Sequence, residues 1–285
     1  MIVNTRISIL LSMTSSEFNT LRQRCSANST ILPSLYGNVA KLMYDADIFL
    51  IFAARNNKLN ARSMEKQIIC MGNSYKNGGR CLAGIEIQNT ASGVSIVKNN
   101  YGLPKWIRPV MANGDNGLPE YLVGSFTMLD ILSVDVTDTV PTGAHCENVH
   151  FSSIRKVGRL GQNSQNLNPL CDTWHTLIFG NRGKAVPNEV FENGDYSLMF
   201  IKPESPVITM QYDDYGHEKY RIQFIYKGTL YDFPLTDTRY INELRSRTKA
   251  CGGRNTGDLY LTLSLGVNHC DWHYKLVAGV IDLAS

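Results

Sequence analysis

Short apolar segments separated by turn residues recur along this chain from residue 66 to about residue 140. The clusters at 76–79 and 113–117 carry the Gly and Asn residues that tight turns favour. Five or six strands within ~75 residues suit a small barrel better than a helical domain. The expected strands cover residues 67–71, 82–88, 94–98, 106–110 and 128–136.

The region from 196 to 284 is again rich in expected strands. Its clearest signal is the alternation at 220–226, which puts four apolar side chains on one face of a strand. A short helix is expected over 239–246, with Asp237 as its N-cap. Three strands, a helix and further strands fit an OB-type barrel, although the same content also fits an SH3-like barrel.

We therefore expect a mainly β protein with two OB-like barrels in tandem and a short helical N-terminal segment. The first barrel is expected over residues 65–145, a connecting segment over 146–195 and the second barrel over 196–285. Residues 1–64 hold helix-like patterns and end in a polar stretch. A charged, strand-like run opens at Met64. Residues 1–64 are thus either a genuine helical extension or an upstream mis-start, with Met64 as the alternative start.

The formal net charge of +3 is concentrated near the N-terminus. Residues 1–64 hold seven Lys/Arg against three Asp/Glu, whereas 65–195 hold eleven against twelve and 196–285 hold ten against ten. The body of the protein is therefore neutral. It lacks the bulk attraction to phosphate that drives non-specific nucleic-acid binding, so any such site is expected to be a local patch.

The cysteines and the apolar segments indicate where the protein resides. Seven cysteines form no C-x-x-C pair, which is typical of reduced, buried thiols. The longest apolar runs, 7–13 and 46–54, are shorter than the roughly 20 residues that cross a bilayer. No secretory signal pattern is present. We expect a cytoplasmic protein without a membrane partner.

Five segments follow one another in a recognisable order: ICMGNSYKNGGRCLAGIEI at 69–87, KWIRPVM at 105–111, AHCENVHF at 144–151, LYDFPLTDTRY at 230–240 and HYKLVAGVI at 273–281. In this order they resemble the signature segments of the dual OB-containing domain family of bacteria. The resemblance covers about residues 66–284 and does not include 1–64. It implies two OB-like barrels with a role in nucleic-acid binding, in the context of bacterial defence.

Two short motifs are candidate contacts with a ligand. Gly78 and Gly79 permit positive φ and bring backbone amides close to a ligand, and Arg80 beside them can clamp a phosphate. The alternative is a tight hairpin turn with a structural arginine. Trp106 and Arg108 lie two apart on an expected strand and share one face. They either stack a base and bind its phosphate, or close a barrel internally.

A polar cluster and two tyrosines add secondary candidates. His145, Glu147, Asn148 and His150 follow a turn, but no third ligand lies at a metal-binding spacing. An inter-domain hydrogen-bonding segment is therefore favoured, and no metal site is predicted. Tyrosines crowd around a hairpin at 213–216, either as a stacking surface or as barrel core, with core favoured. Alternation in the last strand predicts an outward-facing Lys275.

No motif of a nucleophilic or metal-dependent enzyme is present in the sequence. The sequence predicts a non-catalytic binding module without a cofactor, whose ligand is single-stranded nucleic acid or a flexible end. A protein-interaction subunit, favoured by the neutral body, and a sensor of a nucleotide or modified base are the alternatives. The predicted contacts are Gly78, Gly79, Arg80, Trp106 and Arg108, with His145, Asn148, Tyr212 and Tyr215 as secondary candidates.

Overall fold

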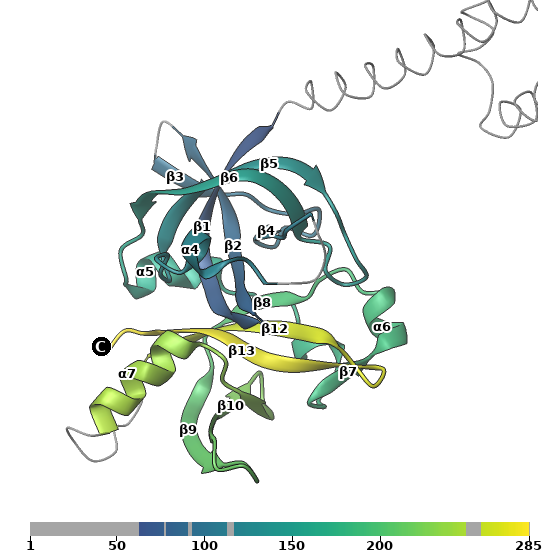
Figure 1. The fold of residues 1–285 in the computed structure, drawn as a ribbon, viewed down its shortest axis with the longest axis vertical. Helices are drawn as coiled ribbons and strands as arrows, with labels where there is room; N and C mark the ends of the chain where they lie inside the picture. The colour runs from purple at the N-terminus through teal and green to yellow at the C-terminus, as the bar shows by residue number, and fades with distance from the viewer. Residues whose placement is uncertain (1–62, 77, 91–92, 113–116, 249–257, 285) are drawn as a thin grey trace, which may run out of the picture. The chain divides into compact units, whose positions relative to one another are not determined.

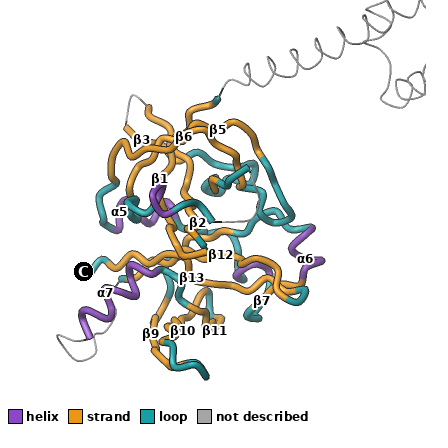
Figure 2. The backbone as a smooth tube through the Cα atoms, in the orientation of Figure 1, coloured by secondary structure: helices purple, strands orange, loops and turns teal. Residues whose placement is uncertain are grey.

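A computed structural model describes residues 63–76, 78–90, 93–112, 117–248 and 258–284. All of these residues belong to one compact unit, Arg62–Ser285. The expected helical segment at 1–64 lies outside the described residues, apart from its last two positions. Strands dominate the described part of the chain (Figure 2), as the sequence predicted.

Five strands of the first barrel close on themselves (Figure 1). Their order is β1-β5-β6-β4-β2, and β2 pairs again with β1. The pair β4–β6 is parallel, whereas the other pairs are antiparallel. A sixth strand, β3, extends the sheet at β2. The strand bounds are β1 Met64–Lys76, β2 Gly79–Thr90, β3 Gly93–Ile96, β4 Trp106–Pro109, β5 Asp130–Thr139 and β6 Asn148–Arg159.

The second barrel repeats this order with two sheets, β11-β10-β9 and β7-β13-β12-β8. A parallel bridge between Leu235 and Val277 links the two sheets. It corresponds to the parallel β4–β6 pair of the first barrel. Both barrels therefore have the OB-like strand order, in place of the SH3-like alternative. The bounds are β7 Ala185–Pro187, β8 Leu198–Ile201, β9 Glu204–Tyr212, β10 Glu218–Tyr226, β11 Thr229–Pro234, β12 Leu259–His269 and β13 Trp272–Asp282.

Helices are few, and most of them are short. The expected helix near 239–246 is α7, Thr238–Thr248. Asp237 caps it, since its Oδ1 accepts from the backbone N–H groups of Arg239 and Tyr240, both at 3.1 Å. The others are α4 Glu120–Val123, α5 Ser164–Leu167, α6 Asn188–Glu192 and the 3-10 turns η1 Asn168–Leu170 and η2 Ile178–Gly180.

The segment expected to connect the barrels, 146–195, does more than connect them. Its first part is β6, whose residues Asn148–Arg159 pair with β5 and β4 in the first barrel. Its last part supplies β7, which pairs with β13 in the second barrel. The sheet of the first barrel therefore continues beyond residue 145, because an OB-like barrel closes only when its fifth strand pairs in parallel with its third.

The two barrels share a hydrophobic cluster. Ile69, Met71 and Ile85 of the first barrel pack in one cluster with Phe200 and Tyr260 of the second. The hydroxyl of Thr262 donates to the carbonyl oxygen of Met71 across the same contact. Because this contact is both apolar and hydrogen-bonded, the barrels are held in a defined arrangement.

The prediction that Lys275 faces outward is wrong. Lys275 is fully buried, and its Nζ donates to the carbonyl oxygen of Ile178 at 2.6 Å and to the backbone and side-chain oxygens of Asn181, both at 2.8 Å. The segment 178–181 folds across β13 and covers this face of the strand. Alternation assigns a side chain to a face, but it does not tell which chain segment later covers that face.

Candidate functional site

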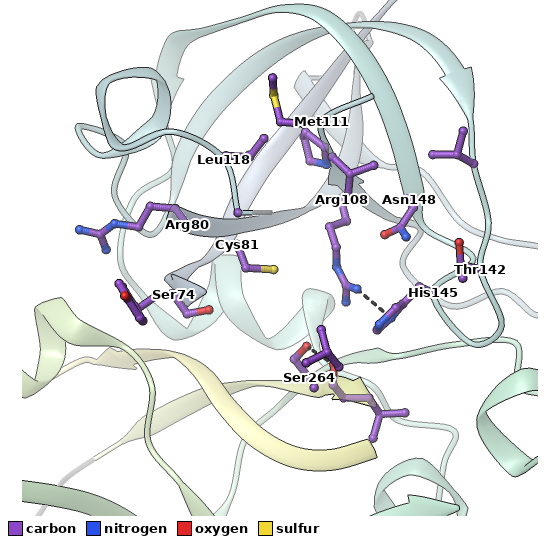
Figure 3. A pocket seen from close by; sticks show the side chains of 18 of the residues that line it. Ser74, Arg80, Cys81, Arg108, Met111, Leu118, Thr142, His145, Asn148 and Ser264 are labelled. Atoms are coloured by element: carbon purple, nitrogen blue, oxygen red, sulfur yellow. Dashed lines mark hydrogen bonds between the residues drawn. The ribbon is translucent and has the colours of Figure 1, made fainter. Parts of the chain in front are cut away.

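A groove between the two barrels brings together most of the predicted polar residues. It is a cavity of about 460 Å³. β1, β2, β4 and β6 of the first barrel form one wall, and β12 and β13 of the second barrel form the other. We call it the inter-barrel groove (Figure 3). Its lining includes Tyr75, Arg80, Arg108, His145, Asn148 and Ser264.

The backbone at the two positions before Arg80 favours glycine for structural reasons. Gly78 has a φ of 77°, a conformation that favours glycine in the turn between β1 and β2. A Cβ on Gly79 would lie 2.5 Å from the carbonyl oxygen of Leu118. Arg80 and Leu118 exchange backbone hydrogen bonds of 2.8 and 2.7 Å at this close approach. The turn thus positions Arg80 at the groove, while the glycines themselves lie outside its lining.

Arg80 is engaged in an ion pair. Its Nε and Nη2 donate to the two carboxylate oxygens of Glu120 at 2.6 and 2.9 Å, and its Nη1 donates to Thr238 of the second barrel at 3.1 Å. The hydrogen bond between Arg80 and Glu120 raises the pKa of the arginine and lowers the pKa of the carboxyl group. In Figure 3 the guanidinium of Arg80 points away from Arg108. The two arginines therefore do not converge on one point.

Arg108 is the centre of a buried network that joins the barrels. Its Nη2 lies 2.6 Å from Glu147 Oε1 and donates to Ser197 Oγ at 2.9 Å, and its Nη1 donates to His145 Nδ1 at 2.7 Å. Ser197, just before β8, donates in turn to Glu147 at 2.5 Å. This is the inter-domain hydrogen-bonding role that the sequence favoured for His145 and Glu147.

The same network contains a serine, a histidine and a glutamate, but it lacks the geometry of a nucleophilic triad. In such a triad the histidine accepts the serine proton and an acid orients the histidine. Here Ser197 Oγ lies 2.7 Å from His145 Nδ1, but it also donates to the carboxylate of Glu147. That carboxylate faces the same ring nitrogen, at 3.8 Å, instead of orienting the histidine from its other nitrogen, and Ser197 is completely buried. The arrangement holds the barrels together without presenting a nucleophile to solvent.

Trp106 lies apart from the groove. Its side chain is half-buried and packs against the cluster shared by the two barrels, with Ile85 as its strand partner. Arg108, two residues later, is only 5% exposed. Trp106 and Arg108 therefore do not form the joint exposed surface that their spacing allowed.

Two polar atoms in the groove wall lack a partner among the described residues. Arg108 Nε, a donor, and Asn148 Oδ1, an acceptor, are both buried without a hydrogen bond. Arg108 and Asn148 are strand partners in the parallel β4–β6 pair, and both line the groove. Their side chains lie near each other in Figure 3. Unsatisfied buried groups of this kind are rare in proteins, and they cost about 1–3 kcal/mol each.

The secondary tyrosine candidates lie elsewhere. Tyr212 and Tyr215 are exposed at the turn between β9 and β10, outside the groove lining. Sequence reasoning missed Tyr75, which is 62% exposed at the groove, and Ser264 on the opposite wall. The strand alternation of β1 could have drawn attention to Tyr75. No local signal relates Ser264 to residues almost 200 positions earlier.

The described residues contain neither a metal-binding cluster nor a membrane-spanning helix. In this part of the chain, no group of three or more His, Cys, Asp or Glu side chains is arranged to hold a metal ion. Across the same residues, no helix is long and apolar enough to cross a membrane.

Comparison with solved structures finds distant likenesses at 8% sequence identity, each covering 76% of this chain. They are the p204 HINb domain (TM-score 0.30, 97% of that chain), the tetrameric p202 HIN2 (0.25, 92%) and a murine DNA binding protein bound with double-stranded DNA (0.26, 98%). No curated protein matches the sequence. The model of the dual OB-containing domain matches residues 66–280. Since this match covers both barrels, the chain belongs to the dual OB-containing domain family.

Proposed function

We propose that the inter-barrel groove binds nucleic acid, either as a single strand or as an unpaired end. The observation that carries the proposal is the unpartnered pair in its wall, Arg108 Nε and Asn148 Oδ1. Both atoms are closed off from solvent in the free groove, so a small rotation of the Asn148 side chain has to expose them. A ligand with an acceptor beside a donor then satisfies both atoms and offsets their desolvation. Base edges present such neighbouring donors and acceptors, and in a single strand these edges are accessible.

The size of the groove and an exposed ring support the proposal. Its volume of about 460 Å³ falls within the range of about 300–1,000 Å³ that ligand sites occupy. Tyr75 lines it with most of its ring exposed. Stacking of a base on an aromatic ring contributes about 1–3 kcal/mol and requires no particular sequence. One or a few bases are thus the natural occupants.

The charges near the groove favour bases over phosphates as the main contacts. Glu120 pairs with Arg80, and Glu147 pairs with Arg108. Neither arginine offers an uncompensated charge, so few counterions are released on binding. Each neutralised phosphate of a single strand contributes about −0.7 to the salt slope. A groove that binds mainly by stacking and hydrogen bonds therefore gives a shallow slope.

The test is fluorescence anisotropy with labelled single-stranded DNA, single-stranded RNA and duplex probes at two salt concentrations. Asn148→Ala removes one hydrogen bond and should weaken single-strand binding about 2- to 12-fold. Tyr75→Ala should weaken it about 5- to 150-fold. Asn193→Ala and Tyr101→Ala change exposed side chains outside the groove and serve as matched controls. Arg108→Ala is a poorer probe, because it also breaks the inter-barrel network.

The outcomes separate the candidate functions. Binding that both groove variants weaken, while the controls retain it, supports the proposal. A mononucleotide that binds as tightly as a 12-mer favours the second candidate, a sensor of a nucleotide or modified base, which a bounded cavity suits. If no probe binds at high micromolar protein, the proposal fails. A protein partner then becomes the leading candidate, since Val207, Met210 and Leu230 are exposed on the β9–β11 sheet. Each of these candidate functions is non-catalytic. A place in bacterial defence stays an expectation from the family resemblance.

A further inference from the structure

The wall of the groove formed by β12 and β13 continues outward as an exposed aromatic face. Ser264 and Leu276 are strand partners that line the groove. Farther along the same hairpin lie Val267 and Tyr274, and then the partners His269 and Trp272 near its tip. We propose that this face, the hairpin platform, stacks the bases of a single strand that leaves the groove. The inference rests on the proposed function and adds a second part to its site.

The alternation of β13 separates the platform from the core. Trp272 and Tyr274 are 44% and 45% exposed, whereas His273 between them is buried and Lys275 after them is fully buried. The rings of His269 and Tyr274 lie 6.3 Å apart across the hairpin. Side chains two residues apart on a strand are separated by about 6.8 Å. This is wider than the rise of about 3.4 Å in a stacked duplex, so the platform fits an extended single strand.

The platform is held in place before any ligand binds. Asn188 at the start of α6 accepts from Asn268 at 2.7 Å and contacts His273 Nε2 at 3.1 Å, and its backbone N–H donates to Asp271 at 2.9 Å. On the buried side, the ring of Phe191 stacks on His273 with centroids 3.6 Å apart. A fixed hairpin loses little conformational entropy when a strand is laid on it, which favours binding.

Two cations just before the edge strand β7 favour nucleic acid over a protein partner. The register aligns Lys184 with Lys275, so its side chain leaves this edge on the face opposite Tyr274. Arg182 and Lys184 are exposed, and neither side chain has an ion-pair partner among the described residues. Lys184 precedes Ala185, the strand partner of Tyr274, and its carbonyl oxygen accepts from the backbone of Lys275. Unlike Arg80 and Arg108, these cations remain available to phosphates that run along the edge of the platform.

The experiment compares a dinucleotide with a 12-mer single strand on the full chain. Trp272→Ala and Tyr274→Ala should each weaken the 12-mer about 5- to 150-fold, by loss of one stacked base, and leave the dinucleotide unchanged. The controls are Trp174→Ala and Tyr101→Ala, which remove exposed rings of the same kinds elsewhere. Arg182→Gln with Lys184→Gln should lower the salt slope of the 12-mer by about 1.4. Thermal unfolding verifies that every variant is folded.

Tryptophan fluorescence gives a second measurement. The 12-mer should quench wild-type emission, and Trp272→Phe should remove most of that quenching while the 12-mer still binds. If the 12-mer binds but Trp272→Ala and Tyr274→Ala bind it like wild type, the platform is overturned and the groove remains. Equal losses for both probes also overturn it, because the hairpin would then act only through the groove. If the wild type binds neither probe, the proposed function itself fails.

Discussion

The two barrels have the same strand order, yet they treat a buried cation in different ways. In the first barrel Arg108 faces the carboxylate of Glu147 at 2.6 Å. In the second barrel the described hydrogen-bond partners of Lys275 Nζ are backbone and amide oxygens, and the ring centre of Tyr231 lies 5.6 Å from this atom. Burial lowers the pKa of Lys275 to about 7. One topology thus accommodates a buried charge either by pairing it or by weakening its hold on the proton.

The barrels also close differently. β1 and β2 of the first barrel form a long antiparallel ladder that completes the cylinder. Among the described residues of the second barrel, one bridge, between Leu235 and Val277, pairs the two sheets, and the chain passes from one sheet to the other between β8 and β9. The closed barrel supplies the polar wall of the groove, and the more open one supplies the hairpin platform. Barrels with the same strand order thus differ in closure, and they contribute different surfaces to the proposed site.

Removing the paired cation tests the first half of this comparison and should have the largest effect. Arg108→Ala leaves Glu147 buried and unpaired, which costs about 3–5 kcal/mol of unfolding free energy. Urea denaturation measures it. Arg80→Ala is the control, because its partner Glu120 is exposed and such pairs contribute about 0–1 kcal/mol. Equal losses for the two variants would contradict the assigned role of Arg108.

A substitution at the contact between the barrels should have an intermediate effect. A Cβ on Gly279 would lie 2.8 Å from both Met128 Cε and the carbonyl oxygen of Met71. Gly279→Ala should therefore destabilise the protein by about 1–3 kcal/mol. Gly158→Ala is the control, since its nearest contact would be 3.6 Å. Calorimetry also shows whether the barrels unfold together. A single transition whose midpoint temperature falls in Gly279→Ala means that they do. An unchanged midpoint would contradict the tight contact.

The pH dependence of stability tests the unpaired cation, Lys275. Its effect per pH unit should be the smallest of the three. The unfolded lysine keeps a pKa of about 10.4, whereas the folded one has a pKa of about 7. Between these values the unfolded chain binds the extra proton, so stability should rise with pH, by at most about 1.4 kcal/mol per unit. Below pH 7 the lysine is protonated in both states, so it no longer contributes to the slope of stability with pH. Lys275→Met should abolish the slope between pH 7 and 9 in urea titrations, and a slope that persists would assign it to another group.

Local patterns in the sequence accounted for much of the fold. Alternation at 220–226 corresponds to β10, and Asp237 caps the helix that the sequence expected after it. The turn at Gly78 is where the pattern of Gly and Asn placed it. These features depend on interactions between residues a few positions apart, so the local sequence is enough to predict them.

Contacts between segments far apart in the chain could not be predicted from local sequence patterns. The sequence selected Arg108, His145 and Asn148, but it did not indicate that Arg108 is buried against Glu147 and Ser197. It also left Trp272 and Tyr274 unnoticed, although their alternation with buried neighbours is visible along β13. Local patterns in the sequence therefore predicted most of the strands and turns and the family resemblance, but they missed β6 and β7 within residues 146–195. Which charges are neutralised and which rings stay exposed depends on packing in the folded chain, because partners such as Arg108 and Ser197 come from segments far apart in the sequence.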